Sequence, residues 1–163
     1  MNIFKLYRDK IIDILKSASK ESLIKLPENL NSINVDIPPS KFNFDISTNV
    51  AMVLSKPNEK SPIALAEILS KLIKKKDHYI DEISIEKPGF INLKLNKDFW
   101  NYFLKNIIND KNYGSQKSLN QKKYLVEFVS ANPTGPLHVG HSRGAILGDV
   151  ISNLLKFNNQ IVT

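Results

Sequence analysis

The hydrophobic pattern of this 163-residue chain changes near residue 110, and this change limits what the chain can fold into. Before it, amphipathic stretches and short alternating runs follow one another. After it come a continuous β-prone run over 124–129, a loop with two prolines and one long helix-like stretch. Alternation is typical of antiparallel strands with one solvated face, whereas an unbroken apolar run is typical of a strand in a parallel sheet. The sequence therefore predicts an α+β unit followed by an α/β unit.

The first unit, over residues 1–110, is predicted to combine helices with an antiparallel sheet. A helix is expected from Ile3 to Ala18, and Ser61-Pro62 marks another, because serine caps a helix and proline suits its first position. Two alternating runs that flank Lys87-Pro88-Gly89 predict a β-hairpin, and a helix follows over 96–109. Shorter predictions are strands at Ile33, Val35, Ile37 and at Phe42, Phe44, Ile46, caps at Ser47 and Thr48, and buried Phe99, Trp100, Phe103, Leu104 and Ile107.

The second unit is predicted at 124–163, after a polar, aperiodic linker over 111–123. Its expected order is strand, loop, helix from about 138 to 157, and the start of a second strand. This order opens a doubly wound, Rossmann-like α/β domain, here truncated. One such unit cannot cover both faces of a parallel sheet, so we expect an N-terminal piece of a longer protein. The helix is expected to turn inward its apolar side chains, Ile146, Val150, Leu154 and Leu155.

Composition narrows the function. The chain has no cysteine, which excludes disulfides, thiolate metal sites and a cysteine nucleophile. No run approaches the roughly 18 apolar residues of a membrane helix, and the N-terminus lacks a secretory apolar region, so we expect a cytoplasmic protein without a membrane partner. The net charge of +7 fits a polyanionic partner such as nucleic acid or nucleotide, with an ordinary lysine-rich surface as the alternative.

The clearest chemical signal lies where the loop after 124–129 enters the helix. Ligands bind at the carboxyl ends of strands in open α/β sheets, and a helix start favours a phosphate. His138 and His141 are three residues apart, so both face one side of the first turn. Gly140 between them leaves room for a flat base, with a simple helix-start glycine as the alternative. Imidazoles here can donate hydrogen bonds to charge that develops during phosphate transfer. The alternative interpretation is that both histidines only cap the helix or lie on the surface.

The motif residues carry a family resemblance. His138-Val139-Gly140-His141 resembles the HIGH signature of class I aminoacyl-tRNA synthetases. The longer run from Ser130 to Gly144, with Gly148-Asp149 after it, resembles the arginyl-tRNA synthetases in particular. In the first unit, 47–52 and 87–92 resemble the additional N-terminal domain of that family. The HIGH-region motif comprises Ala131, Asn132, Pro133, Thr134, Gly135, Pro136, Leu137, His138, Val139, Gly140 and His141.

The resemblance implies an arginine–tRNA ligase. ATP, with Mg²⁺, would activate L-arginine to arginyl-adenylate, and the arginyl group would then move to the terminal ribose of tRNA(Arg). His138 and His141 would be catalytic and would bind ATP together with Gly140; no protein ligand for Mg²⁺ is identified. A monomer is expected. The lysine-rich KMSKS-type loop and the anticodon-binding domain are absent from this sequence, so we expect the piece alone to be inactive.

Glu127 is a candidate for binding the guanidinium group of arginine. It interrupts an apolar run in which an unpaired buried charge is costly, and a carboxylate can accept two parallel hydrogen bonds from a guanidinium. Its position is similar to that of the guanidinium-binding carboxylate of the family, and the resemblance implies that Ser130 and Asn132 hold the amino and carboxylate groups of arginine. An outward carboxylate paired with a lysine is the alternative for Glu127, and loop-stabilising roles are the alternative for the other two.

The first unit has no catalytic constellation, and the resemblance implies that it holds tRNA near the D-loop. Phe42, Phe44 and Asn49 are candidates for base contact, with core aromatics on a strand as the alternative. The usual Gly-Asp of the family is replaced here by 43–45, Asn-Phe-Asp. For the whole chain, two other functions stay open: an HxGH-type nucleotidyltransferase, whose motif usually lies near the N-terminus, and a non-catalytic tRNA-binding module derived from a synthetase.

Overall fold

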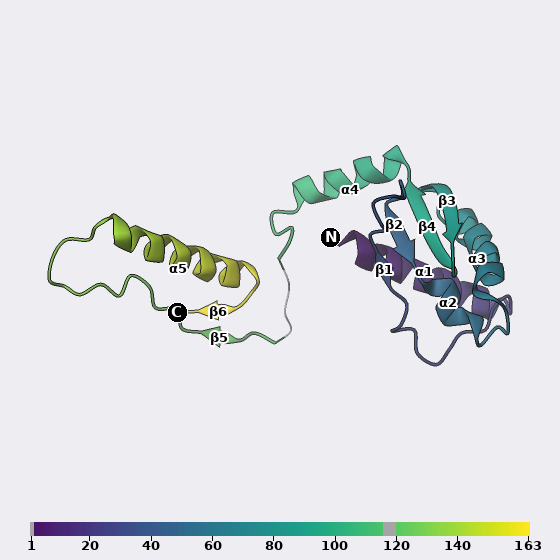
Figure 1. Ribbon diagram of the computed structural model, residues 1–163, viewed down its shortest axis with the longest axis horizontal. Helices are drawn as coiled ribbons and strands as arrows, with labels where there is room; N and C mark the ends of the chain where they lie inside the picture. Colours follow the sequence, from purple (N-terminus) through teal and green to yellow (C-terminus); the bar gives the residue numbers. More distant parts are fainter. Residues whose placement is uncertain (1, 116–119) are drawn as a thin grey trace. The chain divides into compact units, whose positions relative to one another are not determined.

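The computed structural model describes residues 2–115 and 120–163, which divide into a first unit up to Asn109 and a second from Asp110 (Figure 1). Part of the predicted linker, 116–119, lies outside the described residues, and its last residue, Lys123, already belongs to a strand. No helix in the described ranges has the length and apolar character needed to cross a membrane.

A four-stranded antiparallel sheet forms the centre of the first unit, in the order β1-β2-β4-β3. The predicted hairpin is confirmed, with Ile83 opposite Leu93 and Ile85 opposite Ile91. Ile91 and Leu93 are fully buried. Because successive side chains alternate between the faces, Asn92 lies on the other face. The strands are β1 (Val35–Asp36), β2 (Ile46–Thr48), β3 (Ile80–Glu86) and β4 (Phe90–Leu95).

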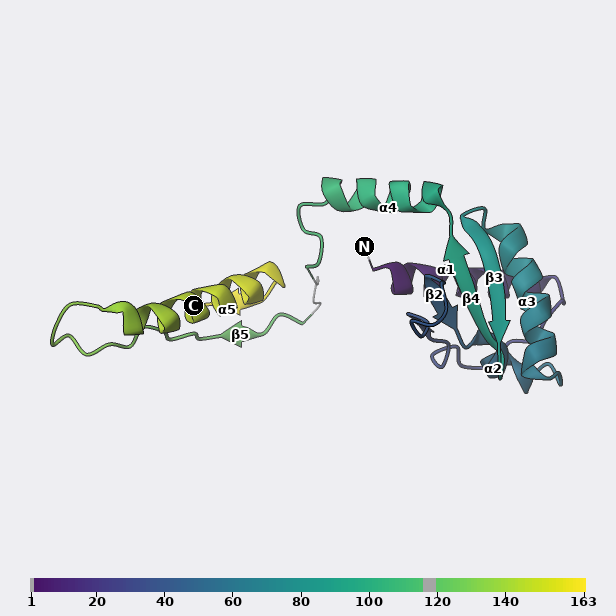
Figure 2. The ribbon, with the colours of Figure 1, turned by 45° about the horizontal axis from the view of Figure 1, so that its top comes forward.

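Four helices accompany this sheet, and Figure 2 shows α1 passing behind it and α3 running beside β3. The buried side chains of α1 recur at three- and four-residue steps, as predicted. The predicted start of α3 is also confirmed, because the Ser61 hydroxyl accepts a hydrogen bond from the Ala64 N–H and Pro62 is the first helical residue. The helices are α1 (Ile3–Lys20), α2 (Val50–Ser55), α3 (Pro62–Lys76) and α4 (Lys97–Asn109).

Four local predictions for the first unit are wrong. The first strand ends at Asp36 and Ile37 is 73% exposed, since the prolines that follow cannot continue a ladder. The second strand begins only at Ile46, after the two phenylalanines. Ser47 lies in that strand and does not cap α2, and Asn49 is the residue before the helix. Thr48 lies in the strand as well, but its hydroxyl accepts a hydrogen bond from the Val50 N–H at 3.3 Å, so that cap prediction is confirmed in part. Leu104 on α4 is exposed, because the helix buries a narrower stripe centred on Phe99 and Phe103.

A partly buried ion pair links α1 to the end of α3. Lys10 Nζ lies 2.7 Å from Asp77 Oδ2, and Asp77 is 4% exposed. The same ammonium lies 5.2 Å from the ring centroid of Tyr7 and 5.0 Å from that of Tyr79. Burial, and to a lesser degree the Asp77 carboxylate, raise the pKa of the Tyr7 hydroxyl. Tyr7 therefore stays neutral, and this cluster fixes the position of α1 rather than serving as a reactive site.

The second unit contains β5 (Lys123–Tyr124), α5 (Val139–Phe157) and β6 (Ile161–Val162) in the predicted order. The two strands pair in parallel, with Lys123 opposite Ile161. Further backbone hydrogen bonds extend this pairing, from the Ile161 N–H to the Lys122 carbonyl and from the Val126 N–H to the Thr163 carbonyl. A helix thus joins two parallel strands.

Two expectations for the second unit are wrong. The strand predicted over 124–129 ends after Tyr124, and Leu125 is 84% exposed. On α5, Ile146, Val150 and Leu154 are exposed rather than inward. Parallel strands become buried only when helices cover both faces of their sheet. Within the described residues, one helix accompanies one strand pair, so most of these apolar side chains have no layer against them.

Candidate functional site at the start of α5

Two imidazoles form the cap of α5. His138 precedes the helix, and its Nδ1 accepts a hydrogen bond from the Gly140 N–H at 3.1 Å. His141 Nδ1 accepts from the His138 N–H at 3.2 Å. The ring centroids lie 4.0 Å apart. The structure therefore brings together the two histidines predicted to act as a pair, and the alternative of helix-capping histidines describes part of their role.

This capping geometry determines which ring atoms face a ligand. A neutral imidazole whose Nδ1 accepts a hydrogen bond carries its proton on Nε2, so both rings keep an Nε2–H donor. His138 is exposed and His141 half-buried. Two such donors beside the positive end of the α5 dipole suit an anion such as a triphosphate. No group of three or more acidic or histidine side chains that could hold a metal ion gathers within residues 2–115 and 120–163.

Gly140 has a local reason to lack a side chain. A Cβ at this position would lie 2.9 Å from His138 Cε1 and 3.0 Å from His138 Nδ1. Any side chain would push the imidazole away from the Gly140 N–H that it caps. From the sequence, Gly140 was expected to leave room for a ligand base, and its close approach to the His138 ring was not predicted.

Glu127, Ser130 and Asn132 lie in the loop that leaves β5. The Ser130 hydroxyl donates a hydrogen bond to Glu127 Oε1. The chain turns between these residues, because Val129 adopts a left-handed φ of 58°. Glu127 and Asn132 are exposed. The expected burial of Glu127 is therefore wrong, because within the described residues no further helix or strand covers this part of the strand pair. With the described residues, Glu127 forms no ion pair within 4.0 Å, and its Oε2 stays available as an acceptor.

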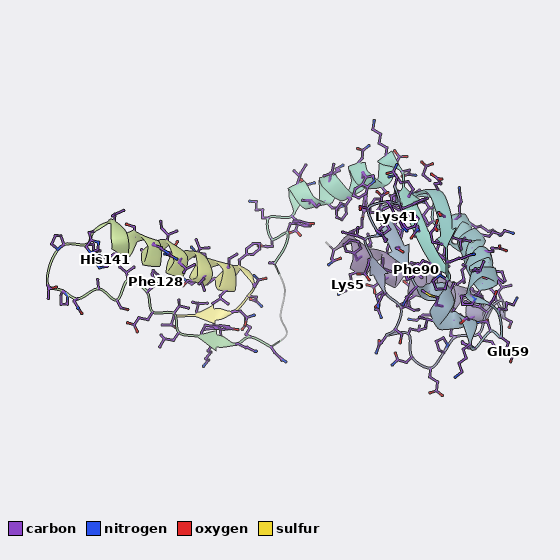
Figure 3. All side chains as sticks on the ribbon, in the orientation of Figure 1. Lys5, Lys41, Glu59, Phe90, Phe128 and His141 are labelled. Carbon is purple, nitrogen blue, oxygen red and sulfur yellow. The ribbon has the colours of Figure 1, made fainter. Side chains whose placement is uncertain are left out.

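A second candidate site is a cleft of about 890 Å³ in the first unit, here called the first-unit cleft. Figure 3 shows two residues of its lining, Lys41 and Phe90. Phe90 is 37% exposed. Asn92 is 1% exposed, and its Oδ1 has no hydrogen-bond partner among the residues that the structure describes. The lining includes Lys41, Phe42, Asn49, Lys87, Phe90 and Asn92.

The three predicted base-contact residues differ in their surroundings. Phe42 lines the first-unit cleft, and Lys41 Nζ lies 4.8 Å from its ring centroid. Phe44 is half-buried and is not part of the lining. Asn49 accepts from the Asn34 N–H at 2.8 Å and donates to the Ser32 carbonyl at 3.0 Å, so its amide holds a loop. The sequence argument assigned no role to Phe90 and Asn92. No pattern in the sequence indicated them, because the position of Asn92 opposite Ser47 depends on the strand register.

Comparison with known families agrees with both units. The family model described as "Arginyl tRNA synthetase N terminal domain" matches residues 5–95. The model described as "tRNA synthetases class I (R), catalytic domain" matches residues 103–163. The capped α5 start therefore lies in a region that matches the catalytic domain of class I tRNA synthetases.

The chain belongs to the arginyl-tRNA synthetase family. It is 62% identical over 164 residues to the arginine–tRNA ligase of Pelagibacter ubique and 43% identical to that of Bartonella henselae. Both alignments cover 100% of this chain, which spans 28% of the length of each relative.

Two solved arginyl-tRNA synthetases share the fold. The Thermus thermophilus structure has a TM-score of 0.51 and the Plasmodium falciparum structure one of 0.57, each at 23% identity over 99% of this chain. The aligned parts are 24% and 30% of those chains.

The two roles of His138 can be separated by substitution. His138→Ala removes the cap and should destabilise the start of α5 by about 1 kcal/mol, whereas His138→Asn supplies another capping side chain and should stay within a few tenths of a kcal/mol of the wild type. Amide hydrogen exchange in the first two turns of α5 measures the difference. Equal protection in wild type and His138→Ala would show that the ring does not cap the helix.

Proposed function

We propose that the protein containing this chain is an arginine–tRNA ligase, which activates L-arginine with ATP and transfers it to tRNA(Arg). The observation that carries the proposal is the paired imidazole cap at the start of α5, within a chain whose two units match two domains of one family. An HxGH-type nucleotidyltransferase would account for the imidazole cap but not for the match of the first unit. A non-catalytic tRNA-binding module derived from a synthetase would share both features, and it differs from the proposal in that it would charge no tRNA. Because tRNA charging serves protein synthesis, we place the protein in the cytoplasm.

The second unit, in this proposal, opens a Rossmann-like nucleotide-binding domain. Support comes from the parallel pairing of β5 and β6 across α5. In such sheets the ligand lies at the carboxyl end of the strand, where the helix begins. ATP, together with Mg²⁺, would supply the α-phosphate that the arginine carboxylate attacks. The Nε2–H groups of His138 and His141 would hold the phosphates and stabilise the charge that develops on them.

Arginine recognition is assigned to the loop after β5. Glu127 offers a carboxylate with an available Oε2, and a guanidinium is bound best by such a planar acceptor. The Ser130 hydroxyl orients this carboxylate through their hydrogen bond. Ser130 and Asn132 would in addition contact the amino and carboxylate groups of arginine. Both ends of the amino acid would thus be bound by one loop that leads directly into α5.

tRNA contact is assigned to the first-unit cleft. Unpaired bases of RNA loops are bound by aromatic stacking together with hydrogen bonds to base edges. Phe90 offers an exposed ring, and the unpartnered Asn92 Oδ1 can accept from a base N–H. Lys41 and Lys87 line the same cleft, but so do Asp36 and Glu86, so the support for tRNA contact here is the aromatic ring and the amide rather than net charge. We place base contact at Phe42, Phe90 and Asn92, and assign Phe44 and Asn49 to the protein structure.

Substitution of Glu127 tests the arginine site in the full-length enzyme. The wild type should charge tRNA with arginine when each amino acid is offered in turn. Glu127→Gln should raise the arginine KM by about tenfold or more, because a charge-assisted bond to the guanidinium is weakened, while the ATP KM changes little. Glu67→Gln, at an exposed carboxylate of α3, is the control. Equal rises of both KM values would assign Glu127 a structural role, and charging of another amino acid would overturn the proposed function.

Substitution of Phe90 tests the first-unit cleft. Stacking of a base on an aromatic ring contributes about 1–3 kcal/mol, so Phe90→Ala should raise the tRNA KM by roughly tenfold and leave the arginine and ATP KM values unchanged. Leu23→Ala, at an apolar side chain that is 58% exposed and not part of the lining, should have no effect. An unchanged tRNA KM in Phe90→Ala would place the tRNA contact elsewhere.

A further inference from the structure

Phe128, in the loop after β5, packs against Gly148 of α5. A Cβ built on Gly148 would lie 2.2 Å from Phe128 Cγ, 2.3 Å from its Cβ and 2.7 Å from its Cδ1. Gly148 is one of two buried residues of α5. Figure 3 shows Phe128 beneath α5 and His141 at the start of the same helix. The ring therefore lies on the helix backbone at a place that only glycine leaves open.

This contact lies next to the residues assigned to arginine. Phe128 directly follows Glu127 in the chain. Packing of the ring against α5 therefore restrains the backbone from which the Glu127 side chain projects. The left-handed turn at Val129 then brings the Ser130 hydroxyl back to that carboxylate.

The same contact sets the spacing between two groups of site residues. Gly148 lies seven residues after His141, which corresponds to about 10 Å along the helix axis. A loop anchored at Gly148 thus holds Glu127 and Ser130 at a fixed distance from the imidazole pair at the start of the helix. Reacting groups on two ligands need such fixed spacing, because small displacements reduce the rate strongly.

We propose that Phe128 and Gly148 are a positioning pair for the arginine site, with the ring of Phe128 seated on Gly148 to fix the Glu127–Ser130 loop against α5. This inference rests on the proposed function. Neither residue touches a substrate in this account. Both act through Glu127 and Ser130.

Glycine-to-alanine substitutions at two positions of α5 test the pair in the full-length enzyme. Gly148→Ala should displace Phe128 and raise the arginine KM on the order of tenfold, with the ATP KM within twofold of the wild type. Gly144→Ala is the matched control, because a Cβ at Gly144 meets nothing within 4 Å in the described chain. It should leave both KM values unchanged, although the same change is made one turn earlier in the same helix.

The double variant separates positioning from a general loss of folding. Phe128→Gly should also raise the arginine KM, because the loop loses its anchor. Adding Gly148→Ala to Phe128→Gly should change that KM by less than twofold, since the ring and the Cβ of residue 128 that a Cβ at 148 would meet are both removed. Equal behaviour of Gly148→Ala and Gly144→Ala, parallel rises of the arginine and ATP KM values, or simple multiplication of the two single effects would each overturn the pair. A wild-type enzyme that charges no arginine would instead overturn the proposed function, and the pair with it.

Discussion

Two hydrogen bonds from backbone N–H groups to imidazole Nδ1 atoms fix the start of α5, and the site depends on them. The first turn of any helix has N–H groups without intrahelical partners, which most proteins satisfy with serine, threonine, aspartate or asparagine. Here His138 and His141 do so. Because each ring accepts through Nδ1, each presents an Nε2–H donor. One local constraint therefore holds the helix start and also sets the chemistry of the groups that face a ligand.

The two units differ in how completely they are packed. The first unit has its own core between the sheet and its helices, with Ile91, Leu93 and Leu54 fully buried. The second unit leaves Ile146 and Val150 exposed on α5. Yet Gly148 and Ser152 are buried on the same helix, where Phe128 approaches. The contacts that position the candidate site are thus formed within the described residues, even though much of the apolar surface around them is exposed.

Local signals in the sequence predicted the elements well. Ser61-Pro62, the hairpin around Lys87-Pro88-Gly89 and the helix start at His138 all depend on a few neighbouring residues, and all are present. Burial was predicted less well, because it depends on neighbouring layers. Ile146 and Leu154 follow a helical period, but within the described residues nothing covers them.

The candidate sites also combine features that local sequence signals predicted with features that depend on the rest of the fold. His138 and His141 were predicted to lie together because they are three residues apart, and they do, although His138 precedes the helix and the two rings meet through the cap. The hydrogen bond between Ser130 and Glu127 needs Val129 in a left-handed conformation. This conformation is rare for a β-branched residue, and no sequence pattern predicts it. The first-unit cleft requires Ser47 on β2 to lie opposite Asn92 on β4, which only the strand register reveals. Phe90 and Asn92 were missed for this reason.

The most direct test of the account is the aminoacylation rate of the full-length enzyme with His141→Ala. If the imidazole stabilises phosphate charge in the transition state, kcat should fall by about 10²-fold, as for the loss of one positioned hydrogen-bond donor. His78→Ala, at an exposed histidine of the first unit, should leave kcat unchanged. A fall of less than about threefold in His141→Ala would contradict the assignment of the capped helix start as the ATP site.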